Sequence, residues 1–165
     1  MENISKHISY AEATNSATAQ RHGISNVPGA TELAAMRRVA GIVFEPLRAT
    51  VGEPVRVSSF YRNPQVNALV GGSATSQHMK GEAMDIERFD KSNYSNAELF
   101  WIIRENFLFD QLIWEFGTEE EPDWVHVSLK TSGNRQQVLQ AYKQSGVTKY
   151  RSFSLLKKIA EKKKK

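Results

Sequence analysis

The most informative stretch of the chain is Ser76-Gln77-His78-Met79-Lys80-Gly81-Glu82-Ala83-Met84-Asp85. It holds a histidine and an aspartate seven positions apart, with a glycine between them. The residues before Gly81 are typical of a loop, whereas those from Ala83 to Ile86 predict a strand. A turn at Gly81 can therefore bring the side chains of His78 and Asp85 to one point.

A third candidate ligand follows about forty residues later, in Asp123-Trp124-Val125-His126. Two imidazoles and one carboxylate form a ligand set that Zn²⁺ accepts, and they leave a fourth position open for water. We therefore expect a catalytic zinc site made of His78, Asp85 and His126. The alternative for so loose a spacing is an ordinary Asp–His hydrogen bond. The other two histidines, His7 and His22, are expected to lie on the surface.

The composition is that of an ordinary globular protein, with 165 residues, 40% hydrophobic and 24% charged. This length favours one domain with a substantial core. The chain has no cysteine, so any metal site must use nitrogen and oxygen ligands. No apolar run predicts a transmembrane helix, and the N-terminus lacks the pattern of a signal peptide. We therefore expect synthesis in the cytoplasm without Sec-type export.

The net charge of +4 is concentrated at the C-terminus, where residues 157–165 contain six lysines and one glutamate. One interpretation is a solvated end of the chain. The other is electrostatic attraction to a polyanion such as nucleic acid, anionic lipid or a cell wall. Outside this tail, no basic surface motif with interleaved aromatic residues indicates specific nucleic-acid binding.

The hydrophobic pattern predicts a small α+β domain with a largely antiparallel sheet flanked by helices. Helices are expected over 31–50 and 94–107, a short one over 10–18, and partial helix from 138 to the end. Strands are expected over 55–60, 83–86, 109–116 and 124–129. We divide the chain into an N-terminal extension packed on the domain (1–30), the domain itself (31–150) and a basic tail (151–165).

Several local signals refine this outline. Asn63 is expected to cap a helix that begins at Pro64, which places Arg62 at a strand-to-helix junction. Ser95 to Glu98 matches a capping box. Thr31 is the expected N-cap of the first long helix, and Pro46 should bend that helix or mark its last turn.

The pattern Ser76-x-His78-x-x-Gly81-x-Ala83-x-Asp85, followed by Asp123-x-x-His126, resembles the signature of the M15 zinc peptidases. That family includes D-alanyl-D-alanine carboxypeptidases, related dipeptidases and phage L-alanyl-D-glutamate endopeptidases. The upstream segment from Ser58 to Asn67 is similar to the family's Ser-Gly-Tyr-Arg motif, with Phe60 in place of glycine. Residues 17–28 also look like a short form found in phage-borne members.

The resemblance implies a hedgehog/D-Ala-D-Ala-peptidase-like fold and the zinc ligands His78, Asp85 and His126. It implies Asp123 as the general base that takes a proton from the attacking water. Glu115 is the alternative, because it is expected to project from a neighbouring strand. Arg62 would hold a substrate carboxylate or polarise the scissile carbonyl. Ser76 would hydrogen-bond the substrate or orient a ligand.

We therefore expect a monomeric zinc peptidase that cleaves an amide in peptidoglycan peptides and acts on the cell wall after release, as phage lysins do. The bond that it cuts is left open. One alternative is a non-catalytic, zinc-containing cell-wall-binding domain on the same scaffold. A second is a nucleic-acid-binding protein whose lysine tail makes the contacts.

Overall fold

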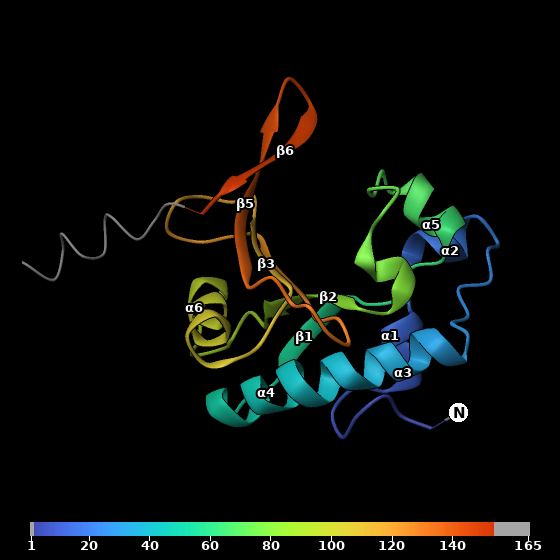
Figure 1. Cartoon of the computed structure of the whole chain (residues 1–165), viewed down its shortest axis with the longest axis horizontal. Coiled ribbons are helices and arrows are strands. Elements are labelled where there is room, and N and C mark those ends of the chain that lie inside the picture. The colour runs from blue at the N-terminus through green and yellow to red at the C-terminus, as the bar shows by residue number, and fades with distance from the viewer. Residues whose placement is uncertain (1, 154–165) are drawn as a thin grey trace, which may run out of the picture.

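The computed structural model describes residues 2–153, which form one open six-stranded sheet with helices around it (Figure 1). The strand order is β1-β2-β4-β3-β5-β6, and every pair is antiparallel except β3 with β5. The mostly antiparallel α+β class is confirmed. The strands are β1 (Val55–Ser59), β2 (Ala83–Arg88), β3 (Gln111–Glu115), β4 (Trp124–Ser128), β5 (Gln137–Gln144) and β6 (Val147–Ser152).

The two faces of the sheet differ in character because side chains alternate along each strand. One face is apolar and packs against the long N-terminal helix and α6 (Asn96–Asn106); its fully buried residues include Leu112, Trp114, Val125, Val127 and Ile86. The opposite face presents Asp85, His126, Ile113 and Glu115, which are cross-strand or same-strand neighbours. The polar residues of interest therefore share a single face.

The N-terminal segment contains two short helices, α1 (Tyr10–Thr14) and α2 (Ala17–Arg21), where one was predicted over 10–18. Ser9 caps α1 and Ser16, which lies between the two helices, caps α2, since each side chain accepts a hydrogen bond from the first turn of the helix that follows. Ile4, Ile8 and Ala13 of this segment are buried in the same core as the sheet.

The first long helix runs as α3 (Ala30–Val39), a π-helical segment (Ala40–Phe44) and α4 (Glu45–Val51). Pro46 does not mark the last turn of this helix, because the helix continues to Val51. The turn before Pro46 widens instead, and the N–H of Glu45 donates to the carbonyl of Ala40, five residues back. The wider turn accommodates the ring of Pro46, which in a regular α-helix would clash with the carbonyl group four residues before it. Thr31 is not the N-cap, because the helix already begins at Ala30 after Gly29.

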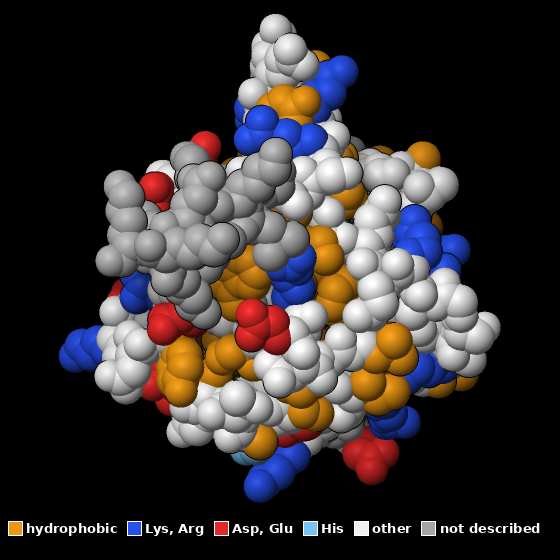
Figure 2. All heavy atoms as spheres, turned by 60° about the vertical axis from the view of Figure 1, so that its left-hand side comes forward, with side chains coloured by type: hydrophobic (Ala, Val, Ile, Leu, Met, Phe, Trp, Pro, Cys, Tyr) orange, Lys and Arg blue, Asp and Glu red, His pale blue; other side chains and the backbone are white. Residues whose placement is uncertain are grey.

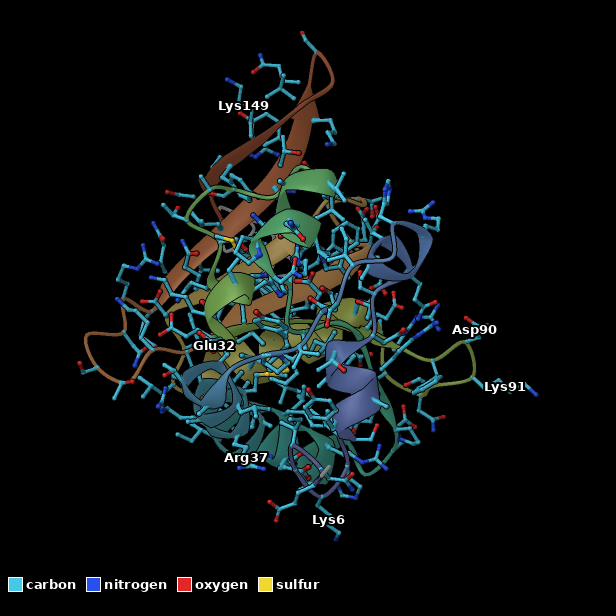
Figure 3. All side chains as sticks on the ribbon, turned by 90° about the vertical axis from the view of Figure 1, so that its right-hand side faces the viewer. Lys6, Glu32, Arg37, Asp90, Lys91 and Lys149 are labelled. Atoms are coloured by element: carbon cyan, nitrogen blue, oxygen red, sulfur yellow. The ribbon has the colours of Figure 1, made fainter. Side chains whose placement is uncertain are left out.

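The C-terminal part of the described chain is a β-hairpin, so the prediction of partial helix from 138 is wrong there. Ser145 and Gly146 join β5 to β6 with φ angles of 51° and 76°, the two positive values that a type I′ turn requires. The hairpin extends beyond the rest of the domain, and Lys149 lies on it (Figures 1 and 3). The lysine-rich tail lies outside the described residues.

The predicted caps are present. The side chain of Asn63 accepts from the N–H of Val66 at the start of α5 (Pro64–Leu69), and α6 carries both hydrogen bonds of the Ser95–Glu98 capping box. Within residues 2–153, no helix combines the length and hydropathy that a bilayer crossing demands.

Candidate metal centre

Three side chains converge on one point of the polar sheet face: His78, Asp85 and His126. His78 Nε2 lies 3.2 Å from both Asp85 Oδ1 and His126 Nδ1, and His126 Nδ1 lies 2.9 Å from Asp85 Oδ1. Ligands bound tetrahedrally at about 2.0–2.1 Å from zinc stand about 3.3 Å apart. The three atoms therefore have nearly the mutual spacing that a small divalent cation requires.

Gly81 and the sheet register bring these side chains together. His78 lies in the 3₁₀ turn η2 (Gln77–Lys80), and Gly81 ends that turn with a φ of 69°. A Cβ on Gly81 would approach the carbonyl oxygen of Glu32 to 2.4 Å, so only glycine fits there. Beyond this turn, Asp85 on β2 stands directly opposite His126 on β4. The predicted turn at Gly81 is confirmed.

The orientation of His78 is set by a backbone group. Its Nδ1 donates to the carbonyl oxygen of Phe60 at 2.7 Å, which leaves a lone pair on Nε2, the atom that faces Asp85 and His126. Such an outer hydrogen bond fixes the tautomer and direction of a histidine ligand. Phe60, which stands where the family motif has glycine, supplies this contact through its backbone while its ring is buried.

The charge states of the cluster also suit a cation. Burial lowers the pKa of His78, although the charge of Asp85 opposes this effect, so its neutral, ligand-competent form is favoured. Burial alone would raise the pKa of Asp85, but its contacts with the imidazoles of His78 and His126 hold it well below its usual range. The cluster thus offers one carboxylate and lone-pair nitrogens, the forms that bind metals.

Arg62 lies beside the three candidate ligands. Its Nη2 is 3.5 Å from Asp85 Oδ2, its side chain is 17% exposed, and its buried Nε has no partner among the described residues. Burial lowers the pKa of Arg62, and the negative charges of Asp85 and Glu115 counteract this. A guanidinium with a free donor next to a metal site can hold a carboxylate or a carbonyl oxygen.

The N-terminal segment holds the Arg62 loop in place. The amide of Asn26, which is buried, donates to the carbonyl oxygen of Tyr61 at 3.0 Å and accepts from the N–H of Asn63 at 2.8 Å. The N–H of Tyr61 in turn donates to the carbonyl oxygen of Ala13 at 3.1 Å. Both residues that flank Arg62 are therefore fixed by residues of the first thirty.

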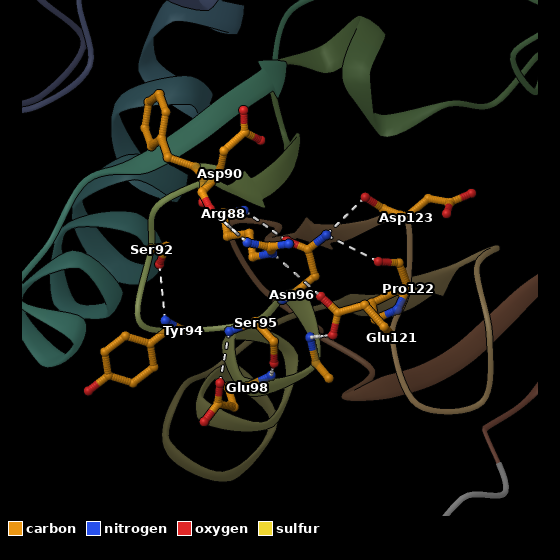
Figure 4. Close-up of polar contacts among 12 residues, drawn as sticks. Arg88, Asp90, Ser92, Tyr94, Ser95, Asn96, Glu98, Glu121, Pro122 and Asp123 are labelled. Atoms are coloured by element: carbon orange, nitrogen blue, oxygen red, sulfur yellow. Dashed lines mark hydrogen bonds and ion pairs between the residues drawn. The ribbon is translucent and has the colours of Figure 1, made fainter.

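Asp123 occupies a bend directly before β4, and its side chain is exposed. Two hydrogen bonds hold the backbone of Asp123. Its N–H donates to the carbonyl oxygen of Glu115 at 2.9 Å, and its carbonyl oxygen accepts from Asn96 Nδ2 at 2.9 Å. Asn96 also contacts Pro122 and the end of β2 at Arg88 (Figure 4). No described hydrogen bond joins the Asp123 carboxylate to the three candidate ligands.

Glu115 is the acid that the sheet directs toward the candidate metal centre. It stands opposite Trp124 on β4, and His126 is its diagonal neighbour on the same face, at a typical separation of about 7–8 Å. The residue is 6% exposed. Burial raises the pKa of Glu115 to about 7; the charge of Asp85 adds to this, whereas His126, Arg62 and Lys143 oppose it. A buried acid with this pKa can exchange a proton near neutral pH.

Ser76, His7 and His22 are not among the three converging side chains. Ser76 is half-buried at the start of η2 and makes no capping hydrogen bond with its side chain. His7 is exposed and pairs with Glu45 at 2.6 Å, and His22 is exposed. The supporting roles of Asn26 and Asn96 cannot be predicted from the sequence, because nothing in its pattern shows that either side-chain amide is buried.

Comparison with known proteins agrees with this geometry. A search of curated proteins finds no match. The family model described as Peptidase M15 matches residues 6–128, which include all three candidate ligands and end before β5 begins. This match spans well over half of the chain, and the chain therefore belongs to the Peptidase M15 family.

Proposed function

We propose that this M15 peptidase is zinc-dependent and hydrolyses an amide bond in bacterial peptidoglycan peptides. The observation that carries the proposal is the triangle of His78 Nε2, Asp85 Oδ1 and His126 Nδ1, with separations of 2.9–3.2 Å. These residues would hold the metal and leave one position free. A bound Zn²⁺ supplies Lewis-acid polarisation of the scissile carbonyl and acidifies a water molecule.

Glu115 is the proton acceptor in this proposal. It lies on the same sheet face as the ligands and it is buried, so its carboxylate is placed to take a proton from water and return it to the leaving amine. Asp123, which the resemblance implies for this role, is the alternative. Its exposed position in the bend before β4 supports the role less well.

Arg62 binds the substrate in this proposal. Its unpartnered Nε and its position beside Asp85 would let it hold a substrate carboxylate or the carbonyl oxygen of the cleaved bond. Ser76 would add a hydrogen bond to substrate from the start of η2. A lysin that reaches the cell wall after release from the producing cell fits the resemblance to phage-borne members.

The competing function is a non-catalytic cell-wall-binding domain that keeps the metal site. A domain of that kind needs no acid beside the ligands. Glu115, buried on the ligand face with its pKa raised to about 7, therefore favours catalysis.

The test is digestion of crude peptidoglycan by the purified, zinc-supplemented chain, with new amino and carboxyl termini identified by mass spectrometry. We expect one class of peptide bond to be cut, and His126→Ala to abolish cutting. Binding to the wall without new termini would support the non-catalytic domain and overturn the proposal.

A further inference from the structure

The β5–β6 hairpin adds a tyrosine to the face that carries the candidate metal centre. Glu115 on β3 stands opposite Ala141 on β5, and Ala141 stands opposite Tyr150 on β6. Directly opposed residues in a sheet project from the same face. Trp124, Glu115, Ala141 and Tyr150 therefore form one row across four strands, next to the row that contains Asp85 and His126.

The small residue in this row leaves room between its neighbours. Ala141 is 1% exposed, whereas Tyr150 is 55% exposed. Strands lie about 4.8 Å apart, so Glu115 and Tyr150 start about 10 Å from each other, and both have side chains long enough to lean over a methyl group. The tyrosine remains open to solvent while its ring borders the polar face.

The electrostatic surroundings of Tyr150 place it near the same charges. Burial raises the pKa of Tyr150, the charges of Glu115 and Asp85 raise it further, and the charge of Arg62 opposes them. A neutral phenol is a hydrogen-bond donor. Tyr150 therefore offers a donor on the β6 side of the ligands, whereas Arg62 offers donors on the β1 side, where the chain leaves that strand.

We propose that Tyr150 is a substrate-binding residue whose hydroxyl donates a hydrogen bond to a peptide carbonyl or carboxylate of the substrate, on the side of the metal centre opposite Arg62. This role rests on the proposed peptidase function. The bound peptide would cross the strands from Arg62 to the hairpin. Tyr150 belongs to a segment beyond the family match, which ends at residue 128, so the family signature does not include it.

The charge of the hairpin supports an anionic substrate on this side. Residues 137–152 contain no aspartate or glutamate, and Lys143, Lys149 and Arg151 are exposed. Figure 2 shows lysine and arginine side chains on the projecting hairpin. Lys143 projects from the same face as Ala141 and Tyr150, interacts with Glu115 and lies 5.3 Å from the centre of the Phe116 ring, so one cation borders the Tyr150 row. Lys149 and Arg151 flank Tyr150 on β6 and project from the opposite face of the hairpin. Such a surface attracts peptides that carry free carboxylates.

Tyr150→Phe removes the donor and keeps the ring. We expect kcat/KM for soluble muropeptides to fall roughly tenfold, the loss expected for one hydrogen bond to substrate, with zinc content and Tm unchanged. The matched control is Tyr142→Phe in the same hairpin, since Tyr142 is adjacent to Ala141 on β5 and so projects from the opposite face. Unchanged kinetic constants in Tyr150→Phe would overturn the proposal.

A second measurement is independent of turnover. Nitration of the zinc-loaded wild-type chain with tetranitromethane, mapped by mass spectrometry, should modify Tyr150 and be suppressed there by soluble muropeptides, with no protection of Tyr142. Equal nitration of Tyr150 with and without bound muropeptides would contradict the role. A wild-type chain that neither binds nor cleaves muropeptides overturns the peptidase function itself, whereas cleavage without Tyr150 protection overturns only this inference.

Discussion

Two buried acids stand at opposite ends of β3, and their surroundings differ sharply. Asp110, directly before the strand, is fully buried; Arg135 Nη2 lies 2.5 Å from its Oδ2 and Lys130 Nζ lies 3.3 Å from its Oδ1. Burial alone would raise the pKa of Asp110, but hydrogen bonds from Arg135 and Lys130 lower it to about 2. Glu115, the last residue, has a pKa raised to about 7 by burial, and no described hydrogen bond or ion pair reaches its carboxylate.

Asp110 is a structural acid, whereas Glu115 is the acid that we propose as the catalytic base. Asp110 anchors the loop after β4, because the N–H of Arg135 also donates to it and the N–H of Gln137 donates to its carbonyl. Both carboxylate oxygens of Asp110 are therefore paired with cations of the same chain. Glu115 faces the candidate metal centre, and no lysine or arginine of residues 2–153 lies at ion-pair distance from its carboxylate, an arrangement that suits proton transfer.

The largest expected effect is on catalysis. Glu115→Gln keeps the shape of the side chain but cannot accept the proton, so kcat should fall by about 10²–10⁴-fold. Zinc content should stay at the wild-type value, because Glu115 is not one of the three candidate ligands. Steady-state kinetics on muropeptides, with metal analysis of the same samples, checks this. A kcat for Glu115→Gln equal to that of the wild type would show that Glu115 is not the catalytic base.

The same substitution should stabilise the zinc-free fold at high pH. The folded pKa of Glu115 is about 7, against an ordinary value of 4.5 for a glutamate, so its ionisation costs stability as pH rises through this interval. We expect Glu115→Gln to raise the free energy of unfolding by on the order of 2–3 kcal/mol at pH 8 and to leave it unchanged below pH 4. Urea unfolding of the zinc-free proteins at both pH values measures it. A gain of equal size at low pH would contradict the raised pKa.

Asp110→Asn should show a smaller effect of opposite sign. The folded pKa of Asp110 is lowered to about 2 from 3.8, so its contribution is present above pH 4 and is lost as pH falls through 2. The free energy of unfolding of the variant should be lower than that of the wild type by on the order of 1–2 kcal/mol at pH 7. Asp90→Asn, in the projecting loop of Figure 3, is the matched control and should leave the urea midpoint unchanged. Equal losses in both variants would argue against a special role for Asp110.

The smallest effect is expected for Asp123. Asp123→Asn keeps the backbone hydrogen bonds to Asn96 and Glu115, and the exposed carboxylate contacts none of the candidate ligands through a described hydrogen bond. We expect kcat to change by no more than about threefold, an effect far below that of losing a general base. A fall comparable to that of Glu115→Gln, measured in the same assay, would assign the base to Asp123 instead.

The parts of the fold that follow from the sequence are those set by local chemistry. Asn63 and Pro64 start a helix, Ser95 and Glu98 form a capping box, and Gly81 takes a positive φ. Each of these signals depends on residues within four positions of one another, so neighbouring side chains alone decide the outcome. His78 and Asp85 are seven positions apart, and the turn at Gly81 between them brings their side chains together.

Long-range pairing explains what the sequence did not show. Residues 137–144 lack a clear strand pattern, and they become β5 because they pair in parallel with β3. Without that pairing, Tyr150 cannot be placed on the face of Glu115. The sequence alone does not decide between Glu115 and Asp123, because the burial that raises the pKa of Glu115 comes from segments distant in sequence.

The central claim is that His78, Asp85 and His126 form a zinc site, and metal stoichiometry tests it most directly. Equilibrium dialysis of the metal-free chain against Zn²⁺, followed by elemental analysis, should give one tightly bound ion per chain. The variants Asp85→Asn and His126→Ala should each lose the ion. The control His7→Ala, which breaks the surface pair of His7 with Glu45, should retain it. A wild-type chain that binds no zinc, or an ion that persists in both ligand variants, would contradict the account.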